Sequence, residues 1–299
     1  MHIGYIGLGK MGLQMAIGLV EKGHTVVGYN KSDAPYQEAR AGGVVIAESY
    51  DDLVSQTLPS LDGSRVFWLM VPHTAVDAVL DELLPRVNKG DIVIDSANSH
   101  WKDSVKRAKR CGEKGISFMD AGFSGGPEGA RTGGCVMVGG EKEVFARLSP
   151  LFSDVAKNQG FGYMGKSGAG HFVKMTHNGI EYGMMQALAE GFALMRASDF
   201  DIDLTEVARV YGSGSVIDSR LVHWLHKGYE KYGEDLADAS TTVGHTGMGA
   251  WTIEAGRDVG VPTPVIEASL EVRKKSPEKE TYTARVLSLL RHMFGGHEL

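Results

Sequence analysis

A glycine-rich turn near the start of the chain constrains the fold more than any other feature of the sequence. The apolar segment 2–6 runs directly into a G-x-G-x-x-G turn, Gly7-Leu8-Gly9-Lys10-Met11-Gly12. Residues 13–22 then have helical character, and residues 24–29 have the composition of a second strand. Strand, turn and helix in this order are the context in which the pattern binds dinucleotides. We therefore expect the six residues of the turn to contact a dinucleotide cofactor.

The three glycines of the turn have different expected roles. Gly7 permits the tight turn, Gly9 lets a pyrophosphate approach the backbone, and Gly12 lets the helix pack closely on the strand. The diphosphate would then lie at a helix N-terminus, where free N–H groups and the helix dipole favour anions.

The end of the second strand should select between NAD and NADP. An acidic residue there would bind the ribose hydroxyls of NAD. This chain instead has Asn30, Lys31 and Ser32, an amide, a cation and a hydroxyl that suit a 2′-phosphate. Asp33 could reach back and favour NAD. We expect NADP as the cofactor, with NAD as the alternative.

Alternating strands and helices continue through the first half of the chain. Strand-like segments are expected at 66–71, 91–95, 117–121 and 135–139, with helices at 75–84 and 101–114 between them. This alternation predicts a doubly wound, mainly parallel sheet of the Rossmann type.

Ligands of such sheets bind at the carboxyl ends of the strands. Three predicted loops fall there, and they contain Val71 and Pro72, Asn98 within 95–99, and Ser124-Gly125-Gly126 within 121–131. We expect Val71, Pro72 and Asn98 to contact the cofactor. The hydroxyl and unhindered N–H groups of the third loop suit a substrate carboxylate.

The second half of the chain is mostly helical in pattern. With 299 residues, the chain exceeds what one hydrophobic core usually serves. We therefore predict a dinucleotide-binding domain at 1–166 and an all-α domain at 167–299 for substrate binding and oligomerisation.

One predicted helix in this half carries an unusual set of polar residues. Lys174, Asn178 and Glu181 stand at i, i+4 and i+7 and share one helix face at about 100° per residue. His177 lies at the edge of that face. A base, an acid and two further polar groups thus converge, as in an active site. Gly179 and Gly183 are expected to interrupt the helix, and they predict close approach of a ligand or another backbone.

Composition excludes several classes of function. A net charge of −6 argues against non-specific nucleic-acid binding. No apolar segment reaches the roughly 18 residues of a membrane span. No signal peptide is evident, so we expect a cytoplasmic protein. Cys111 and Cys135 form no metal-binding pattern, so we expect reduced, buried thiols and no metal site.

Together these residues resemble the decarboxylating 6-phosphogluconate dehydrogenases, in a short form with a reduced helical domain. The resemblance covers essentially the whole chain. Its marks are the glycine turn, 95–99, Ser124-Gly125-Gly126, residues 174–186, Trp251-Thr252 and Phe294-Gly295-Gly296-His297. The glycine turn and the Lys174–Asn178 pair are shared with the wider β-hydroxyacid dehydrogenase superfamily. The segment 177–183, with Glu181, is more specific.

The resemblance implies a role for each residue of the polar helix. Lys174 would be the general base that takes the proton of the substrate's C3 hydroxyl while a hydride passes to the nicotinamide. Glu181 would be the general acid that protonates the enediol after CO₂ is lost. The substrate contacts that it implies are Asn98, Ser124, Gly125, Gly126, Lys174, His177, Asn178 and Glu181.

The resemblance also implies a phosphate site and an oligomer. Tyr182 and Arg273 would hold the 6-phosphate of a phosphorylated sugar acid. Arg291 and His297 would enter the site of a neighbouring subunit, so that the protein is at least a dimer and could be a tetramer.

One departure from the family bears on the substrate. Relatives usually place a lysine or arginine just before the tryptophan of the segment 245–251 or a few residues earlier, whereas Ala250 precedes Trp251 here. Loss of that cation would weaken the grip on phosphate or indicate another sugar acid. The alternative function is a non-decarboxylating β-hydroxyacid dehydrogenase of the 3-hydroxyisobutyrate type.

Overall fold

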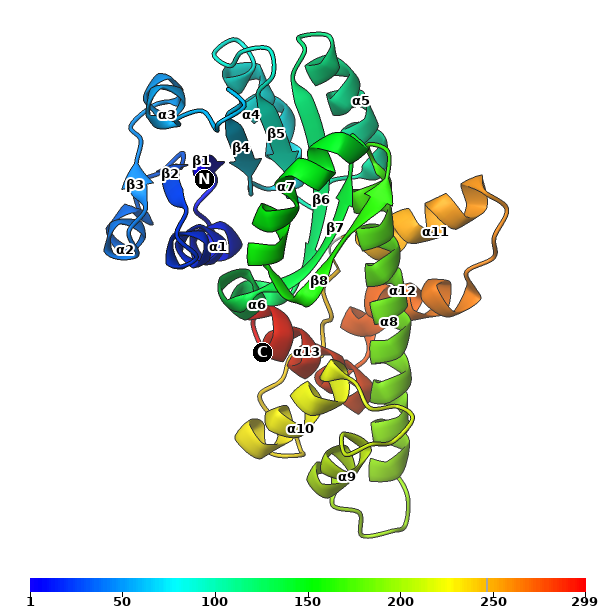
Figure 1. Cartoon of the computed structure of the whole chain (residues 1–299). Helices are drawn as coiled ribbons and strands as arrows, with labels where there is room; N and C mark the ends of the chain where they lie inside the picture. Colours follow the sequence, from blue (N-terminus) through cyan, green and yellow to red (C-terminus); the bar gives the residue numbers. More distant parts are fainter. Residues whose placement is uncertain (246) are drawn as a thin grey trace. The chain divides into compact units, whose positions relative to one another are not determined.

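The computed structural model describes residues 1–245 and 247–299, and the chain divides into two compact units (Figure 1). The first unit is Met1–Met175 and the second is Thr176–Leu299. Thr246, which belongs to the segment 245–251, lies outside the described residues. The domain boundary at residue 166 stays a prediction.

The first unit contains an eight-stranded sheet in the order β3-β2-β1-β4-β5-β6-β7-β8. Every neighbouring pair is parallel except β6 and β7, so the predicted doubly wound, mainly parallel sheet is confirmed. The strands are β1 (His2–Ile6), β2 (Thr25–Tyr29), β3 (Val45–Ile46), β4 (Val66–Leu69), β5 (Ile92–Asp95), β6 (Ser117–Ser124), β7 (Gly134–Gly139) and β8 (Ala156–Gly165).

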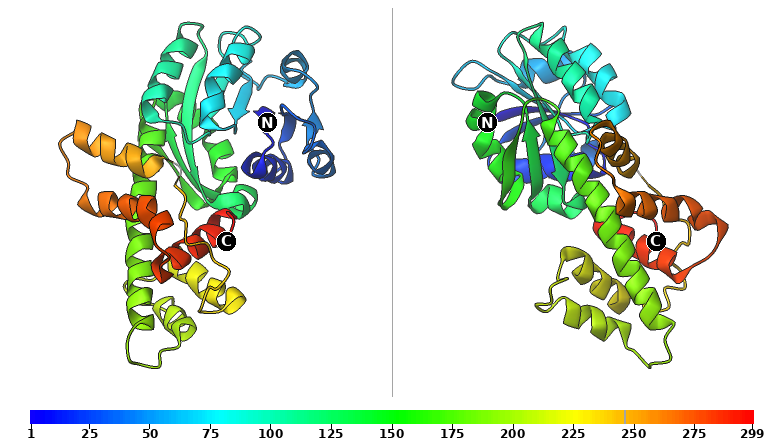
Figure 2. Two further views of the ribbon diagram at one scale, coloured as in Figure 1. Left: turned by 180° about the vertical axis from the view of Figure 1, so that it is seen from behind. Right: turned by 90° about the vertical axis from the view of Figure 1, so that its right-hand side faces the viewer.

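Helices cover both faces of this sheet, as Figures 1 and 2 show. They are α1 (Lys10–Glu21), α2 (Tyr36–Ala41), α3 (Tyr50–Gln56), α4 (Val76–Leu83), α5 (Trp101–Gly112), α6 (Gly126–Thr132) and α7 (Lys142–Asp154). Successive strand residues point to opposite faces. On β4, Trp68 accordingly packs in the core under α1 and α7, whereas Phe67 packs in the core under α4 and α5.

The glycine-rich segment 121–131 is not the loop that the sequence predicts. Strand β6 continues to Ser124, and helix α6 begins at Gly126. Pro127 explains the early helix, because its fixed φ suits the first helical turn. Only the sharp corner needs glycine freedom, with φ of +64° at Gly126.

The described residues of the second unit form helices and loops and no strand, which confirms the predicted all-α half. Its long helix α8 (Ala169–Arg196) begins in the first unit. The others are α9 (Leu204–Tyr211), α10 (Arg220–Tyr232), α11 (Met248–Asp258), α12 (Pro264–Lys275) and α13 (Tyr282–Gly295). Phe192 of α8 packs with Tyr229 of α10 and Leu289 of α13 in the core of this unit.

The glycines inside α8 do not interrupt it. A β-carbon on Gly179 would lie 2.7 Å from the side chain of Thr252 on α11, and one on Gly183 would lie 3.2 Å from Val265 on α12. These glycines therefore let two neighbouring helices pack on α8. The expected approach of another backbone was wrong, because the nearest atoms belong to side chains, and the expected approach of a ligand stays a prediction.

Candidate active site

The glycine turn has the geometry that a dinucleotide diphosphate requires. Gly7 has a φ of +102°, and a β-carbon there would clash with Met70. A β-carbon on Gly12 would clash with the carbonyl of Gly7. Gly9 is the N-cap of α1, and a β-carbon there would have no atom within 4 Å. The space in front of Gly9, at a helix N-terminus without an acidic first turn, fits a bound diphosphate.

Asn30 joins the end of β2 to this turn. Its Oδ1 accepts a hydrogen bond from the Leu8 N–H at 3.0 Å, and its Nδ2 donates to the carbonyl of Ser32 at 2.9 Å. Lys31 and Ser32 are exposed beside it. The amide therefore shapes the loop, and the exposed cation and hydroxyl remain available for a phosphate.

Asn98 bridges two of the predicted ligand loops. The residue has a φ of +51°, and its side-chain amide accepts from the N–H of Phe123 at 2.9 Å and donates to the carbonyl of Phe123 at 3.2 Å. Ser124 follows as the last residue of β6. This amide therefore holds the loop 95–99 against the end of β6, which the sequence did not reveal.

Val71 and Pro72 follow the end of β4, next to the glycine turn. The side chain of Val71 would lie 2.7 Å from a β-carbon on Gly7. Their placement therefore agrees with a role beside the cofactor, although that role stays a prediction.

Lys174 is buried in the first unit, with 5% of its surface exposed. Its aliphatic stem lies against Gly122 of β6, where a β-carbon would meet Cγ of Lys174 at 2.9 Å. Gly122 is therefore a site residue that sequence reasoning missed, because its only signal was a glycine within a strand.

The remaining polar residues follow Lys174 along the uninterrupted helix α8. Nδ1 of His177 lies 3.0 Å from Oδ1 of Asn178 and 3.7 Å from a carboxylate oxygen of Glu181. Nδ2 of Asn178 contacts Sδ of Met248 on α11 at 2.6 Å. The side chain of Glu181 is 22% exposed. Because the helix is continuous, Lys174, Asn178 and Glu181 share one face as predicted.

Arg273 on α12 is 2% exposed and stacks on Tyr182, with Cζ 3.6 Å from the ring centroid. It donates to the carbonyl of Gly244 at 3.4 Å, whereas its Nε has no hydrogen-bond partner. No carboxylate of the described chain lies within ion-pair distance of it. Burial lowers the pKa of Arg273 to about 10. The guanidinium is therefore a buried cation without an anion.

Arg291 on α13 reaches the same place. Its Nη1 would lie 3.1 Å from a β-carbon on Gly244, so both guanidinium groups flank this glycine. Burial lowers the pKa of Arg291, and its charge acts on Arg273. The second unit thus brings Tyr182, Arg273 and Arg291 together within one chain. The predicted entry of Arg291 into a neighbouring subunit stays a prediction.

His297 lies beyond the end of α13, where the chain turns back. Its carbonyl oxygen lies 2.6 Å from Nδ1 of His292, and its ring would contact a β-carbon on Gly295. The tail is thus folded on its own helix in this chain, and the role of His297 in a neighbouring site also stays a prediction.

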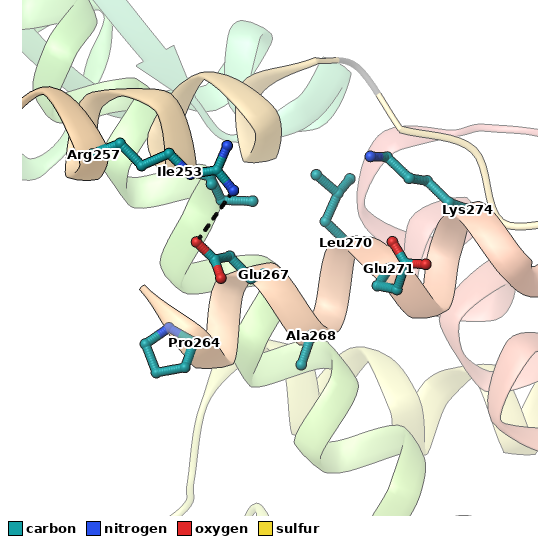
Figure 3. Close-up of a pocket in the computed structure, with 8 residues that line it drawn as sticks. All are labelled: Ile253, Arg257, Pro264, Glu267, Ala268, Leu270, Glu271 and Lys274. Atoms are coloured by element: carbon teal, nitrogen blue, oxygen red, sulfur yellow. Dashed lines mark ion pairs between the residues drawn. The ribbon is translucent and has the colours of Figure 1, made fainter. Parts of the chain in front are cut away.

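A separate pocket of about 460 Å³ lies between α11 and α12 (Figure 3). Its lining includes Leu270, Lys274 and an ion pair of Arg257 with Glu267 at 3.7 Å. None of the predicted site residues lines it, and two of its charged residues, Arg257 and Glu267, pair with each other. We therefore assign it no role in the chemistry.

Three further findings bear on the sequence predictions. Cys111 is buried, but Cys135 is exposed, so the expectation of two buried thiols was wrong for Cys135, which stands near the start of β7. Within 1–245 and 247–299, no group of three metal-ligating side chains lies together. No helix described here is long and apolar enough to cross a membrane.

Comparison with known proteins covers both halves of the chain. The family profile of the NAD binding domain of 6-phosphogluconate dehydrogenase matches residues 2–165, and that of the 6-phosphogluconate dehydrogenase C-terminal domain matches residues 170–294.

Similar proteins agree with these profiles. The Bacillus subtilis protein YqeC, a 6-phosphogluconate dehydrogenase by name, is 43% identical over 99% of this chain and 98% of its own. The NAD⁺-dependent, decarboxylating 6-phosphogluconate dehydrogenase of Haloferax volcanii is 40% identical over 100% of this chain and 98% of its own.

A solved structure shows the same fold. The 6-phosphogluconate dehydrogenase of Plasmodium falciparum, described with NADP⁺ and with 6-phosphogluconate, superposes with a TM-score of 0.83 at 30% identity. The match covers 94% of this chain but only 63% of that one, which is longer. The chain therefore belongs to the 6-phosphogluconate dehydrogenase family of NAD(P)-dependent oxidoreductases.

Proposed function

We propose that this protein oxidises and decarboxylates 6-phospho-D-gluconate to ribulose 5-phosphate and CO₂, with hydride transfer to NADP⁺ or NAD⁺. The observation that carries the proposal is the face of α8 on which Lys174, Asn178 and Glu181 follow one another. Membership of the family and the decarboxylating relative from Haloferax volcanii support it.

Each of the two proton transfers in the proposed reaction has a residue to carry it out. A bound nicotinamide supplies the hydride acceptor for C3. Lys174 takes the proton of the C3 hydroxyl, which leaves a 3-keto acid and an ammonium group. The carboxylate leaves as CO₂, and the new carbonyl accepts the electron pair, which the ammonium of Lys174 stabilises. Glu181 then protonates the carbon that has lost CO₂.

The phosphate of the substrate would pair with Arg273 and Arg291. Two guanidinium groups present parallel donors to a phosphate dianion, and such charge-assisted hydrogen bonds are strong. Ala250, which stands before Trp251 on α11, is exposed and has no donor group. The two arginines would take over the role of the basic residue that is missing there. Asn98, Ser124, Gly125 and Gly126 are proposed to hold the carboxylate end of the substrate.

We propose NADP as the preferred cofactor. The exposed Lys31 and Ser32, beside an Asn30 that is held by the turn, suit a 2′-phosphate. The Haloferax relative is named as NAD⁺-dependent, so the ratio of kcat/KM for the two cofactors is the measurement that decides.

The alternative, a dehydrogenase of the 3-hydroxyisobutyrate type, uses a small unphosphorylated acid and releases no CO₂. Such a reaction needs neither the acid Glu181 nor two cations at Gly244. The identity to 6-phosphogluconate dehydrogenases over the whole chain makes this alternative less favoured.

A substrate panel tests the proposal. Purified protein is given 6-phosphogluconate, gluconate or 3-hydroxyisobutyrate with each cofactor, and cofactor reduction and CO₂ release are followed together. We expect equal amounts of both products with 6-phosphogluconate. Lys174→Met should abolish turnover and leave cofactor binding intact, whereas Lys157→Met, an exposed control, should behave as wild type. Reduction without CO₂ would contradict the proposal.

We also propose that the protein self-associates and that its tail completes a neighbouring site. Truncation after Gly295 should raise the KM for 6-phosphogluconate without changing that for the cofactor. Mixing truncated subunits with Lys174→Met subunits should restore turnover only if the tail acts between subunits.

A further inference from the structure

The first turn of α8 is held by a buried carboxylate to which the proposed reaction gives no role. Asp120 on β6 is fully buried. One of its oxygens accepts from the N–H of Gly168 at 2.6 Å, and the other accepts from the N–H of His171 at 2.8 Å. Both oxygens thus act as acceptors, as those of an ionised carboxylate do. Lys174 follows one turn after His171.

Glycines make room for this contact. A β-carbon on Gly139 of β7 would lie 2.6 Å from Oδ1 of Asp120, and one on Gly170 of α8 would lie 2.5 Å from the carbonyl of Asp120. The start of α8 is therefore pressed against the backbone of β6 and β7, and Asp120 fixes its height above the sheet.

Asp120 and Lys174 lie over the same strand. Asp120 and Gly122 are two residues apart on β6, so their α-substituents face the same side of the sheet, roughly 7 Å from each other along the strand. The stem of Lys174 lies on Gly122. The stem of Lys174 and the carboxylate of Asp120 thus lie over neighbouring positions of one buried strand, where charges interact more strongly than in water.

Asp120 differs from the buried carboxylate beside it, Asp95, in having no paired arginine in the described chain. Asp95 stands opposite Asp120 in the parallel register of β5 and β6 and is equally buried. Asp95 has an ion pair with Arg107 at 3.2 Å, but Asp120 has no cation within ion-pair distance among the described residues. Its charge is matched by backbone N–H groups at the start of α8.

We propose that Asp120 is a positioning residue for Lys174, which holds the first turn of α8 and supplies the counter-charge for the ammonium group that forms when Lys174 takes a proton. This role rests on the proposed function of Lys174 as the base. Without the carboxylate, the ammonium form is less stable, so the pKa of Lys174 falls and stabilisation of the enolate weakens.

Other titratable groups lie near Lys174 or on the same helix. Cys135 on β7 feels the charge of Lys174, and the Asp95–Arg107 pair is internally neutral. On α8 itself, the side chain of His171 is bound to Ser104 of α5 at 2.7 Å. His177 and Glu181 are one and two turns further along the same helix. A change at Asp120 alone alters the charge of none of these side chains.

The test compares Asp120→Asn with Ser104→Ala. The first variant removes the charge at nearly constant size, and the second removes the side-chain anchor of His171 but keeps the charge. The pKa of Lys174 is measured by NMR titration of protein with ¹³C-labelled lysine, with the resonance assigned by its loss in Lys174→Met. We expect that pKa to fall by about one unit in Asp120→Asn and to stay within about 0.2 unit in Ser104→Ala.

Turnover gives a second readout on whichever acid the wild type oxidises. We expect kcat to fall roughly 10- to 100-fold in Asp120→Asn, with the KM for the cofactor within about two-fold of wild type, because positioning errors near 1 Å are this costly. The acid limb of the pH profile of kcat/KM should move down with the pKa.

Two outcomes would overturn the inference: an unchanged pKa of Lys174 in Asp120→Asn, or an equal shift in Ser104→Ala, which would make helix loosening the cause. If Asp120→Asn does not fold, Asp120→Ser takes its place, and failure of both to fold means that the role is structural. The titration needs no turnover, so a wild type inactive on every acid would refute the proposed function and leave this test standing.

Discussion

Two buried arginines, one in each unit, have opposite surroundings. Arg107 on α5 donates to Asp77 at 2.8 Å and to Asp95 at 3.2 Å. Burial alone would lower its pKa, but the hydrogen bond with Asp77 and the charge of Asp95 outweigh burial, so the pKa is raised. Arg273 is just as buried, yet its contacts among the described residues are with an aromatic ring, a carbonyl and a sulfur atom, and burial lowers its pKa to about 10.

Arg107 is thus a structural cation, whereas Arg273 has the surroundings of a cation that binds an anionic ligand. Burying a guanidinium is costly unless an anion accompanies it. At Arg107 the chain supplies that anion. Among the described residues it supplies none within ion-pair distance of Arg273 or Arg291, so folding leaves two cations that an external anion can pair with. The first arginine should therefore matter for stability and the second for substrate affinity.

The largest effect should appear in unfolding. Arg107→Met leaves Asp95 buried without its counter-ion, and we expect a loss of about 3–5 kcal/mol in the free energy of unfolding. Arg273→Met removes an unmatched charge and should leave that free energy unchanged or higher. Urea denaturation of both variants measures the contrast. Equal losses for the two arginines would break the comparison.

The next effect concerns substrate affinity. Arg273→Met should raise the KM for 6-phosphogluconate about 100-fold, which corresponds to a lost charge-assisted contact of about 2.7 kcal/mol. The KM for the cofactor should not change. Arg257→Met, an exposed arginine of the same unit, serves as the control. Initial-rate kinetics decide, and a rise below about three-fold would show that Arg273 does not bind the phosphate.

A gain of affinity should follow from restoring the missing cation. Ala250→Lys places an ammonium on α11 at the exposed position where the resemblance to the family implies a basic residue. We expect the KM for 6-phosphogluconate to fall about 10-fold while that for gluconate stays constant, because the added contact is to the phosphate. If both fall together, the new charge acts as a general attraction and the site lies elsewhere.

The smallest effect should come from the exposed partner of Arg107. Arg107 holds the pKa of Asp77 below its usual 3.8, so the ionised form is favoured by folding. The stabilisation is present above pH 4 and is lost as the pH falls through the lowered pKa. The side chain of Asp77 is 61% exposed, so Asp77→Asn should cost under about 0.5 kcal/mol at pH 7. At pH 3 the cost should shrink, and urea denaturation at both pH values tests this.

Most of the first unit could be predicted because its strands are short buried segments separated by helical patterns. The two strands that sequence patterns missed lack that signal. Strand β3 is two residues long, and β8 begins with the polar run Lys157 to Gly160. Strand β6 was cut short because glycines after Ala121 suggested a loop, although Gly122 lies within the strand to admit Lys174.

The site was partly predictable for the same reason. The shared face of Lys174, Asn178 and Glu181 depends only on helical periodicity, which is local. The support of Lys174 by Gly122 and Asp120 depends on contacts between residues some 50 positions apart. The meeting of Arg273 and Arg291 at Gly244 likewise depends on how three distant segments pack, which no local pattern encodes.

The unbroken course of α8 has a consequence for how this protein can diverge. One extra residue anywhere between Lys174 and Glu181 would swing the carboxyl about 100° around the helix axis, and one residue fewer would swing it as far the other way. Exposed loops away from the site tolerate a change of length far better. The number of residues between these two side chains therefore has to stay constant for the proton transfer. A variant with a different number there should have lost that step.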